Sequence, residues 1–179
     1  VVKTTNGGIN WKVNNNLENM FSNIKDVCFL NSNIGWICTD TKIVKTTNGG
    51  LNWTVKFIDN LTSFNTIQFV NLYTGFCVGY KIYRTTDEGN NWFEIVNPNN
   101  GYPFTSIFFT DSQQGFIQGY VYNSFAGNLY VYKTLNSGMN WQQVYSYGYA
   151  GSGLTLEDIY FINGQTGWII GNNRLLRTN

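Results

Sequence analysis

The stretch Lys45-Thr46-Thr47-Asn48-Gly49-Gly50-Leu51-Asn52-Trp53 decides how this sequence is interpreted, because the chain returns to it at intervals of 39 to 49 residues. The other copies are Lys3–Trp11, Arg84–Trp92 and Lys133–Trp141, and a further copy begins at Arg177. A repeat of about 40–50 residues is typical of chains that repeat one supersecondary unit, often the blade of a propeller. The spacing therefore predicts the fold before any other feature.

Within each copy the pattern is Thr-x-Asn/Asp-x-Gly-x-x-Trp. The Thr hydroxyl and the Asn or Asp side chain can bond to backbone N–H groups of a turn, and Gly can take the left-handed backbone conformation. The Trp ring can then cover the turn. We expect a structural role for these positions, which are Thr4, Asn6, Gly8 and Trp11; Thr46, Asn48, Gly50 and Trp53; Thr85, Asp87, Gly89 and Trp92; and Thr134, Asn136, Gly138 and Trp141.

Each repeat also contains segments with apolar residues at alternate positions, such as Val27–Asn31, followed by a Gly-aromatic step such as Gly35-Trp36. Alternation of this kind predicts strands, and the Asn/Asp-to-Gly interval predicts a short hairpin loop. Four antiparallel strands per repeat describe a propeller blade, so we predict an all-β fold, a β-propeller. The whole blades are expected at 24–57, 64–96 and 104–145, with strands three and four of a split blade at 1–13 and strands one and two plus the start of strand three at 156–179.

The repeated turn resembles the Asp-box of BNR-repeat β-propellers, a group that includes sialidases, sortilin-type receptor domains and two-domain xyloglucanases. With a preceding Lys or Arg and a following Asn-Trp, it is most similar to the photosystem II stability/assembly-factor family. Three of the four copies carry Asn where Asp is usual. The resemblance covers the whole chain and implies a propeller of about seven blades, with the Asp-box as a structural turn away from any active site.

The two terminal half-blades leave the ring incomplete, and three interpretations are open. The halves at 1–13 and 156–179 could join and close a ring of four blades, although that ring would be unusually tight. Our preferred expectation is that the chain is a fragment of a longer propeller. Two copies that share blades, a homodimer, are the third interpretation. An open chain would expose strand edges and the apolar face of a terminal blade.

Composition excludes several functions. The formal net charge of +1 offers no general attraction for nucleic acid, and no apolar run is long enough for a membrane span. The chain has no His, which rules out Ser-His-Asp and Cys-His catalysis. We expect no metal site and no cofactor, because Cys28, Cys38 and Cys77 form no CxxC pair. These cysteines are expected as buried apolar fillers, with a Cys28–Cys38 bridge as the minor alternative.

Tyrosines gather in two segments that break the repeat, a lengthened hairpin at 120–132 and a connection at 145–153. Insertions in repeat proteins map to loops on one face, and in a propeller both segments would open opposite the repeated turns. The candidates for partner contact are Tyr120, Tyr122, Tyr130, Tyr145, Tyr147 and Tyr149. Tyr offers a large contact area at a small entropy cost, but these side chains could also only pack the hairpin against its neighbour.

A cation recurs once per repeat, immediately before the turn, at Lys3, Lys45, Arg84, Lys133 and Arg177. In a ring these residues would form a circle of positive charge at the turn end. In the assembly-factor family, a patch of this sort is thought to meet a protein partner, and the resemblance extends that expectation here. The alternative is that they are solvated strand-end charges of little consequence.

Enzymatic interpretations are weaker. Glycoside hydrolysis needs two facing carboxylates, and Asp26, Asp158 and Glu157 are the only acids that merit attention. We therefore predict a non-catalytic protein-binding or assembly module. The alternatives are a carbohydrate-binding or glycosidase-type propeller and a purely structural component of a surface or virion. A secreted, periplasmic or cell-surface location is favoured.

Overall fold

The computed structural model describes residues 2–13, 23–122, 126–150, 156–171 and 174–178, and the described residues form only strands, turns and bends. The first four-stranded sheet contains β3 (Ile24–Phe29), β4 (Gly35–Thr39), β5 (Lys42–Thr46) and β6 (Thr54–Ile58). The second contains β7 (Phe64–Phe69), β8 (Gly75–Gly79), β9 (Ile82–Thr85) and β10 (Phe93–Ile95). The third contains β11 (Phe104–Phe109), β12 (Gly115–Tyr122), β13 (Ala126–Thr134) and β14 (Gln142–Ala150).

Two smaller sheets complete the described part of the chain. The N-terminal hairpin pairs β1 (Val2–Lys3) with β2 (Lys12–Val13), and the last sheet has the order β15 (Leu156–Phe161), β16 (Gly167–Gly171), β17 (Arg174–Arg177). Every pairing within the sheets is antiparallel between sequence neighbours. This is the meander of a propeller blade, and it confirms the predicted all-β propeller with three whole blades and two partial ones.

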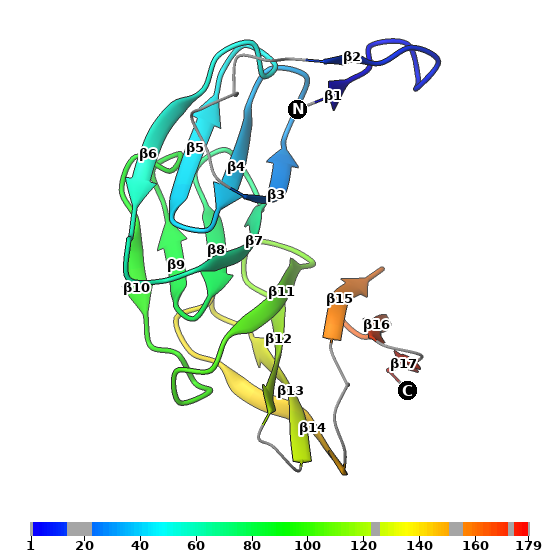
Figure 1. The fold of residues 1–179 in the computed structure, drawn as a ribbon. Helices are drawn as coiled ribbons and strands as arrows, with labels where there is room; N and C mark the ends of the chain where they lie inside the picture. Colours follow the sequence, from blue (N-terminus) through cyan, green and yellow to red (C-terminus); the bar gives the residue numbers. More distant parts are fainter. Residues whose placement is uncertain (1, 14–22, 123–125, 151–155, 172–173, 179) are drawn as a thin grey trace.

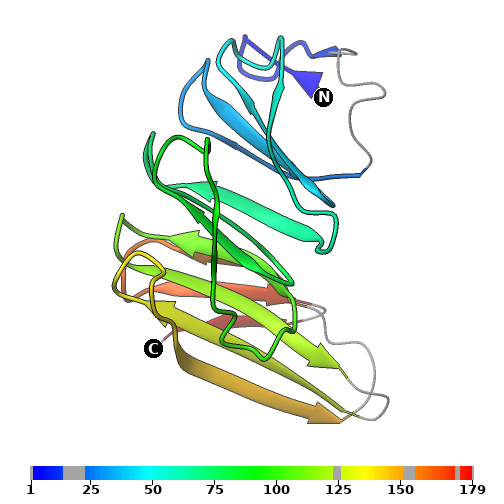
Figure 2. The ribbon, with the colours of Figure 1, turned by 90° about the vertical axis from the view of Figure 1, so that its left-hand side faces the viewer.

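The sheets stack face to face along an arc, with the β1–β2 hairpin at one end and β15–β17 at the other (Figures 1 and 2). The first strand of each sheet faces the inside of the arc, so that β3, β7, β11 and β15 lie next to one another. The two partial blades belong to separate sheets and do not join, so the described residues form an open arc instead of the closed four-bladed ring.

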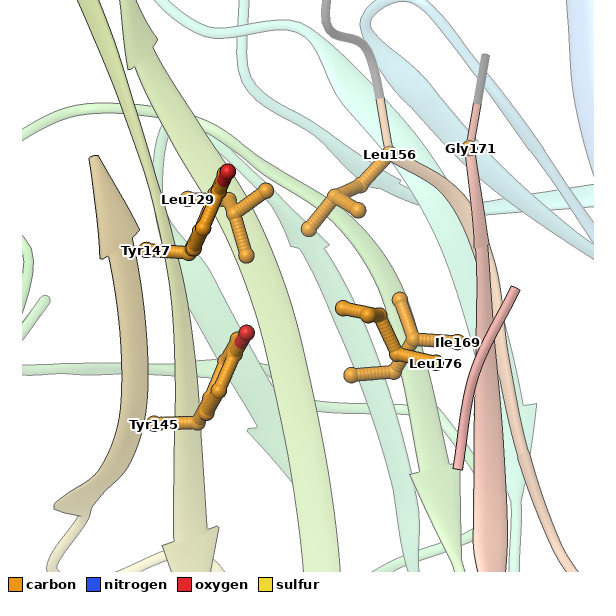
Figure 3. A pocket seen from close by; sticks show the side chains of 7 residues that line it. All are labelled: Leu129, Tyr145, Tyr147, Leu156, Ile169, Gly171 and Leu176. Carbon is orange, nitrogen blue, oxygen red and sulfur yellow. The ribbon is translucent and has the colours of Figure 1, made fainter. Parts of the chain in front are cut away.

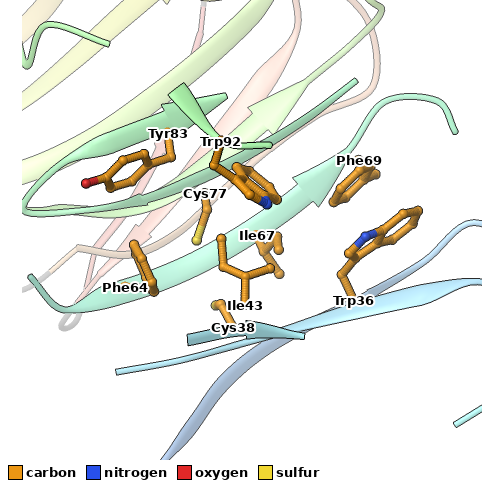
Figure 4. Close-up of a cluster of buried hydrophobic side chains, with 9 residues drawn as sticks. All are labelled: Trp36, Cys38, Ile43, Phe64, Ile67, Phe69, Cys77, Tyr83 and Trp92. Atoms are coloured by element: carbon orange, nitrogen blue, oxygen red, sulfur yellow. The ribbon is translucent and has the colours of Figure 1, made fainter. Parts of the chain in front are cut away.

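Aromatic rings hold neighbouring blades together in a repeated arrangement. Trp36 on β4 stacks on Phe69 of the next blade, with centroids 3.5 Å apart, and Trp92 meets the same Phe69 edge-on at 5.9 Å. Figure 4 shows these rings within the buried cluster between the first two blades. The next two interfaces repeat the stack with Phe76–Phe109 and Phe116–Phe161. Such contacts explain the aromatic content of 17 %.

The stacked ring also explains the repeated glycine of the turn. Gly89 has a φ of +81°, and a Cβ at this position would lie 3.0 Å from the indole nitrogen of Trp36 in the preceding blade. Gly138 meets Phe76 in the same way, at 2.7 Å. Glycine is therefore needed here for two reasons, the positive φ and the close approach of the neighbouring blade.

Polar side chains join the inner strands where backbone hydrogen bonds between sheets are absent. Asp26 on β3 accepts hydrogen bonds from the Thr66 hydroxyl at 2.7 Å and from the Ile67 N–H at 2.9 Å. Gln68 on β7 accepts from the Phe109 N–H at 2.7 Å. Two of these bonds pair a backbone N–H of one inner strand with a side chain of the preceding blade, and the third pairs two side chains.

The cysteines are free thiols, so the Cys28–Cys38 bridge considered from the sequence is absent. Cys38 and Cys77 are buried and face each other across the first blade interface, and burial raises the pKa of Cys77 well above its usual range. Cys28 is partly buried, and its sulfur accepts a hydrogen bond from the Phe69 N–H at 3.3 Å. Among the described residues, no helix is long and apolar enough to cross a bilayer.

Candidate functional site

The Thr and the Asn or Asp side chains hold the repeated turn with the same hydrogen bonds in all four copies. In the third copy the Thr85 hydroxyl donates to Asp87 at 2.9 Å and accepts from the Gly89 N–H at 3.0 Å. Asp87 in turn accepts from the Asn91 N–H at 2.9 Å, and the Trp92 indole N–H donates to the Gly89 carbonyl at 3.1 Å. The corresponding Thr and Asn bonds recur in the other copies. These side chains are engaged with their own backbone.

Asp87 is the one carboxylate at its position of the repeat, where the other three turns carry Asn, and its surroundings favour the charged form. The hydrogen bond from the Asn91 N–H, followed by those from the Asn91 and Thr85 side chains, lowers its pKa. Asn48 and Asn136 make the equivalent Thr and backbone bonds without a charge. The charge is therefore not needed for the turn geometry.

The repeated cations lie beside aromatic rings. In each blade the cation is the cross-strand partner of the aromatic residue that follows Gly. Lys45 lies 5.3 Å from the ring centroid of Trp36 and Lys133 lies 5.4 Å from Phe116, distances suited to cation–π attraction. Arg177 lies 5.9 Å from the Trp168 ring.

The position of Lys45 in the repeat suggested a solvated charge in a circle of cations, but its side chain is buried and paired. Its side chain is only 7 % exposed, and its ammonium donates to the Glu88 carboxylate of the next blade at 2.8 Å. Lys3 reaches the equivalent turn of the first blade, where it donates to the Gly49 carbonyl at 2.8 Å. Arg84 is half-buried, and one of its terminal nitrogens lies 3.5 Å from the Met139 sulfur. These three cations stand at blade interfaces, whereas Lys133 and Arg177 border a groove.

The tyrosines of the lengthened hairpin divide between the two faces of the third blade. Tyr120 and Tyr147 are cross-strand partners of Leu129, and Tyr145 is the partner of Val131, so all three share the face turned toward the last sheet. Tyr130 belongs to the opposite face, where it packs against the cluster shared with the second blade. Tyr130 therefore does not share a face with Tyr145 and Tyr147, although the sequence suggested a common one. The side chains of Tyr122 and Tyr149 lie outside the described residues.

Tyr145 and Tyr147 point from β14 toward apolar side chains of the last sheet (Figure 3). They line a pocket with Leu129, Leu156, Ile169, Gly171 and Leu176. Its volume is about 10 Å³, which is room for about one water molecule. This pocket is too small for a sugar ring or a peptide side chain, so it is a gap in packing.

A larger groove lies beside it, between β13–β14 and the last sheet. It has a volume of about 680 Å³ and is lined by apolar and cationic residues, among them Val144, Tyr145, Leu176, Lys133 and Arg177. One wall is β17, the edge strand of its sheet, for which the described residues provide no further strand. The groove therefore brings one candidate tyrosine and two candidate cations to an open strand edge.

The carboxylates considered for glycosidase chemistry are occupied elsewhere. Asp26 is tied to β7 as described above, and Asp158 accepts from the Ser106 hydroxyl of the third blade at 2.7 Å. Glu157 is exposed, and no described contact brings it to face a second carboxylate. Within the described ranges, no group of His, Cys, Asp and Glu side chains could hold a metal ion. The arrangement offers binding surface and no pair of facing carboxylates.

Two features of the site were not anticipated from the sequence. One is the position of Lys45, Lys133 and Arg177 over the aromatic ring of the adjacent strand. The regular interval between the Gly-aromatic step and the cation was the signal for it. The other is the groove along β17, which depends on how the third blade and the last sheet meet.

A scan against models of protein families and a search of curated proteins find no match. Among solved structures, the chain is similar to YCF48 from Cyanidioschyzon merolae, with a TM-score of 0.67 and 15 % identity over 99 % of this chain and 62 % of that one. An ancestral GH74 enzyme gives a TM-score of 0.72 and 17 % identity over 88 % of this chain and 23 % of the enzyme. A streptogramin B lyase gives a TM-score of 0.60 and 11 % identity over 90 % of this chain and 56 % of the lyase.

At these identities the likeness concerns the fold, and it places the chain among β-propellers. The chain spans less than two thirds of the length of each of these three structures. Two of the three are named as enzymes of different kinds, so the shared architecture does not by itself assign an activity.

Proposed function

We propose that this propeller is a non-catalytic protein-binding module that receives an extended polypeptide in the groove along β17. The observation that carries the proposal is the groove of about 680 Å³, in which Tyr145, Lys133 and Arg177 lie beside apolar side chains. An extended polypeptide can lie in such a groove, where pockets select its side chains. We further propose that the repeated turns are Asp-boxes with a structural role, in keeping with the resemblance to assembly-factor propellers.

The groove favours a particular kind of polypeptide. Tyr145 is 39 % exposed, and Val144 and Leu176 supply apolar surface next to it. Lys133 and Arg177 add positive charge at the turn end of the groove. A strand that alternates apolar and acidic residues matches both properties, because alternate side chains of a strand point to opposite faces.

The test uses fluorescent peptides of about 12 residues with alternating Val and Glu, and a glycan array as the second probe. We expect the peptides to bind, and Tyr145→Ala and Arg177→Glu each to weaken binding about tenfold or more, in line with the loss of an aromatic or charged anchor. Tyr73→Ala is the matched control, because Tyr73 is 58 % exposed on the loop between β7 and β8 and lies outside the groove.

The alternatives predict different outcomes. Glycan binding that depends on Tyr145, with no response to peptides, would favour a carbohydrate-binding propeller. Failure of both probes would contradict the proposal and favour a structural component. Peptide binding that is unchanged by both groove variants would place the binding surface elsewhere.

A further inference from the structure

The cysteines of the chain all lie at one place in the fold, the interface between the first two whole blades. Cys38 on β4 and Cys77 on β8 belong to the buried cluster between these blades, and neither side chain is exposed to solvent. Cys28 on β3 packs against the same cluster from its margin. Figure 4 shows Cys38 and Cys77 pointing from opposite sheets into the space between them. The fold thus gathers thiols that are far apart in the sequence.

The alternation of side chains along the second strand of each blade explains why two of these thiols face each other. In β4, Trp36 and Cys38 lie on the face turned toward the second blade. In β8, Cys77 lies on the face turned back toward the first blade, whereas Phe76 and Val78 pack in the next interface. Successive residues of a strand point to opposite sides of its sheet. The backbone itself therefore opposes Cys38 and Cys77 across one interface.

The equivalent positions of the other interfaces carry larger side chains without a thiol. Val78 and Ile117 stand there in the second interface, and Gln118 and Ile169 stand there in the third. Both departures toward cysteine thus occur at the same interface and at the two positions that face each other. Packing requires sulfur at neither position, whereas two opposed thiols can form a bond.

We propose that Cys38 and Cys77 are a latent disulfide pair, which a small disulfide oxidises so that the first two blades become covalently joined. In the first step, the thiolate of one cysteine attacks a sulfur of the small disulfide and releases one small thiolate. The thiolate of the other cysteine then attacks the protein sulfur of this mixed disulfide, and the second small thiolate leaves. The protein thiols lose two electrons and two protons, which convert the small disulfide into two thiols.

Burial makes this oxidation depend on opening of the interface. All the cysteines are free thiols in the structure. Burial, followed by the proximity of Cys38, raises the pKa of Cys77 well above its usual range. Because the thiolate is the reacting species, exchange within the closed interface is slow. The small disulfide reaches the pair when the blades separate locally, and the new bond then holds them together.

Cys28 is the competing partner, and its position is less suitable. It lies in the same sheet as Cys38, but its cross-strand partner is Trp36. Its sulfur also accepts the hydrogen bond from the Phe69 N–H at 3.3 Å. A bond from Cys28 to Cys38 would run diagonally within one sheet and would give up this contact. The opposed pair instead joins two sheets and leaves the contact of Cys28 in place.

The experiment incubates the 179-residue chain with oxidised glutathione, with and without urea below the unfolding transition, and then blocks free thiols with iodoacetamide. Mass spectrometry should find tryptic peptide 26–42 joined to peptide 57–81, with one cysteine alkylated and faster formation in urea. The cross-link restricts the unfolded chain, so the urea midpoint of unfolding should rise by about 1 M. Dithiothreitol should restore the original midpoint.

Three variants identify the reacting thiols. Peptide 26–42 contains both Cys28 and Cys38, so Cys28→Ser, which should form the same cross-link, assigns the bond to Cys38. Cys38→Val and Cys77→Ile carry residues that stand at these positions in other blades. Both should fold without forming the cross-link, and oxidised glutathione should not change their urea midpoints.

Several results would overturn the inference. They are complete alkylation of the cysteines after prolonged oxidation with and without urea, a bond within peptide 26–42, glutathione retained as the only modification, and cross-links between chains. A cross-link that lowers the urea midpoint would also contradict the proposed pair, because it would show that the bond distorts the interface. The groove along β17 takes no part in this reaction, so each outcome is independent of the proposed function.

Discussion

The first and second copies of the repeated turn have the same local structure, but their tryptophans are buried to very different extents. The Thr hydroxyl accepts a hydrogen bond from the N–H four residues further on at 3.0 Å in the turn of Thr4 and at 2.9 Å in that of Thr46. Trp11 is nevertheless 60 % exposed, whereas Trp53 is 7 % exposed. The difference arises because Trp53 packs edge-on against Phe29 of its own blade, whereas the β1–β2 sheet has no further strand in the part of the chain that the structure describes.

The comparison separates two roles of the repeat. The hydrogen bonds of the turn form from residues within nine positions, so they need no neighbouring sheet. Burial of the tryptophan needs strands one and two of the same blade. The turn is thus a local unit, and most of its contribution to stability comes from the blade that surrounds it.

The largest expected effect is the contrast between Trp53→Ala and Trp11→Ala. Removing the buried ring should lower the free energy of unfolding by about 3–5 kcal/mol, because it leaves a cavity. Removing the exposed ring of Trp11 should change the free energy of unfolding by less than about 0.5 kcal/mol. Urea unfolding followed by circular dichroism measures both.

The hydroxyl at the start of the turn should give the next largest effect. Thr85 is fully buried, and Thr85→Val removes the acceptor of the Gly89 N–H, which should cost about 1–3 kcal/mol. Thr4→Val should cost less than about 1 kcal/mol, because water can replace the hydroxyl at a partly exposed turn. Thermal unfolding of both variants tests this. Equal losses of stability would show that the contribution of the hydroxyl does not depend on burial of the turn.

A smaller, pH-dependent effect should distinguish the third turn from the Asn turns. Because the pKa of Asp87 is lowered in the folded chain, its contribution is present above the unfolded value of about 3.9 and is lost as the pH falls through the folded pKa. Asp87→Asn should therefore lose less stability than the unaltered chain between pH 5 and pH 3. Urea unfolding at these two pH values tests it; parallel losses would contradict the assigned role of the charge.

The smallest effect concerns the cations of the two regions. A double-mutant cycle of Lys45→Met and Glu88→Gln should give a coupling of about 0.5–1 kcal/mol, since the ion pair is only partly withdrawn from water. Lys3→Met, which removes a bond to a carbonyl, should change the free energy of unfolding by less than about 0.5 kcal/mol. A zero coupling would mean that Lys45 acts mainly through the Trp36 ring.

The repeat predicted much of the fold because strands, loops and turns recur with their spacing intact. Alternation around Val27 and Ile67 and the Gly-aromatic steps were sufficient to place the strands of the blades. The sequence did not distinguish Trp11 from Trp53, because burial depends on which strands surround a turn. It also did not show that Tyr130 turns away from Tyr145, because this depends on the register of β13 with β14, in which Tyr145 pairs with Val131 and not with Tyr130.

The side chains that bridge the inner strands have a consequence for how the molecule opens. Each blade is bonded only to the blade before and the blade after it, through groups such as Asp26 and Gln68. In a stack linked in this way, we expect unfolding to begin at the end sheets and to proceed inward. Amide protons of β8 should therefore exchange most slowly with solvent, and those of β1 and β17 most rapidly, with a gradient between them.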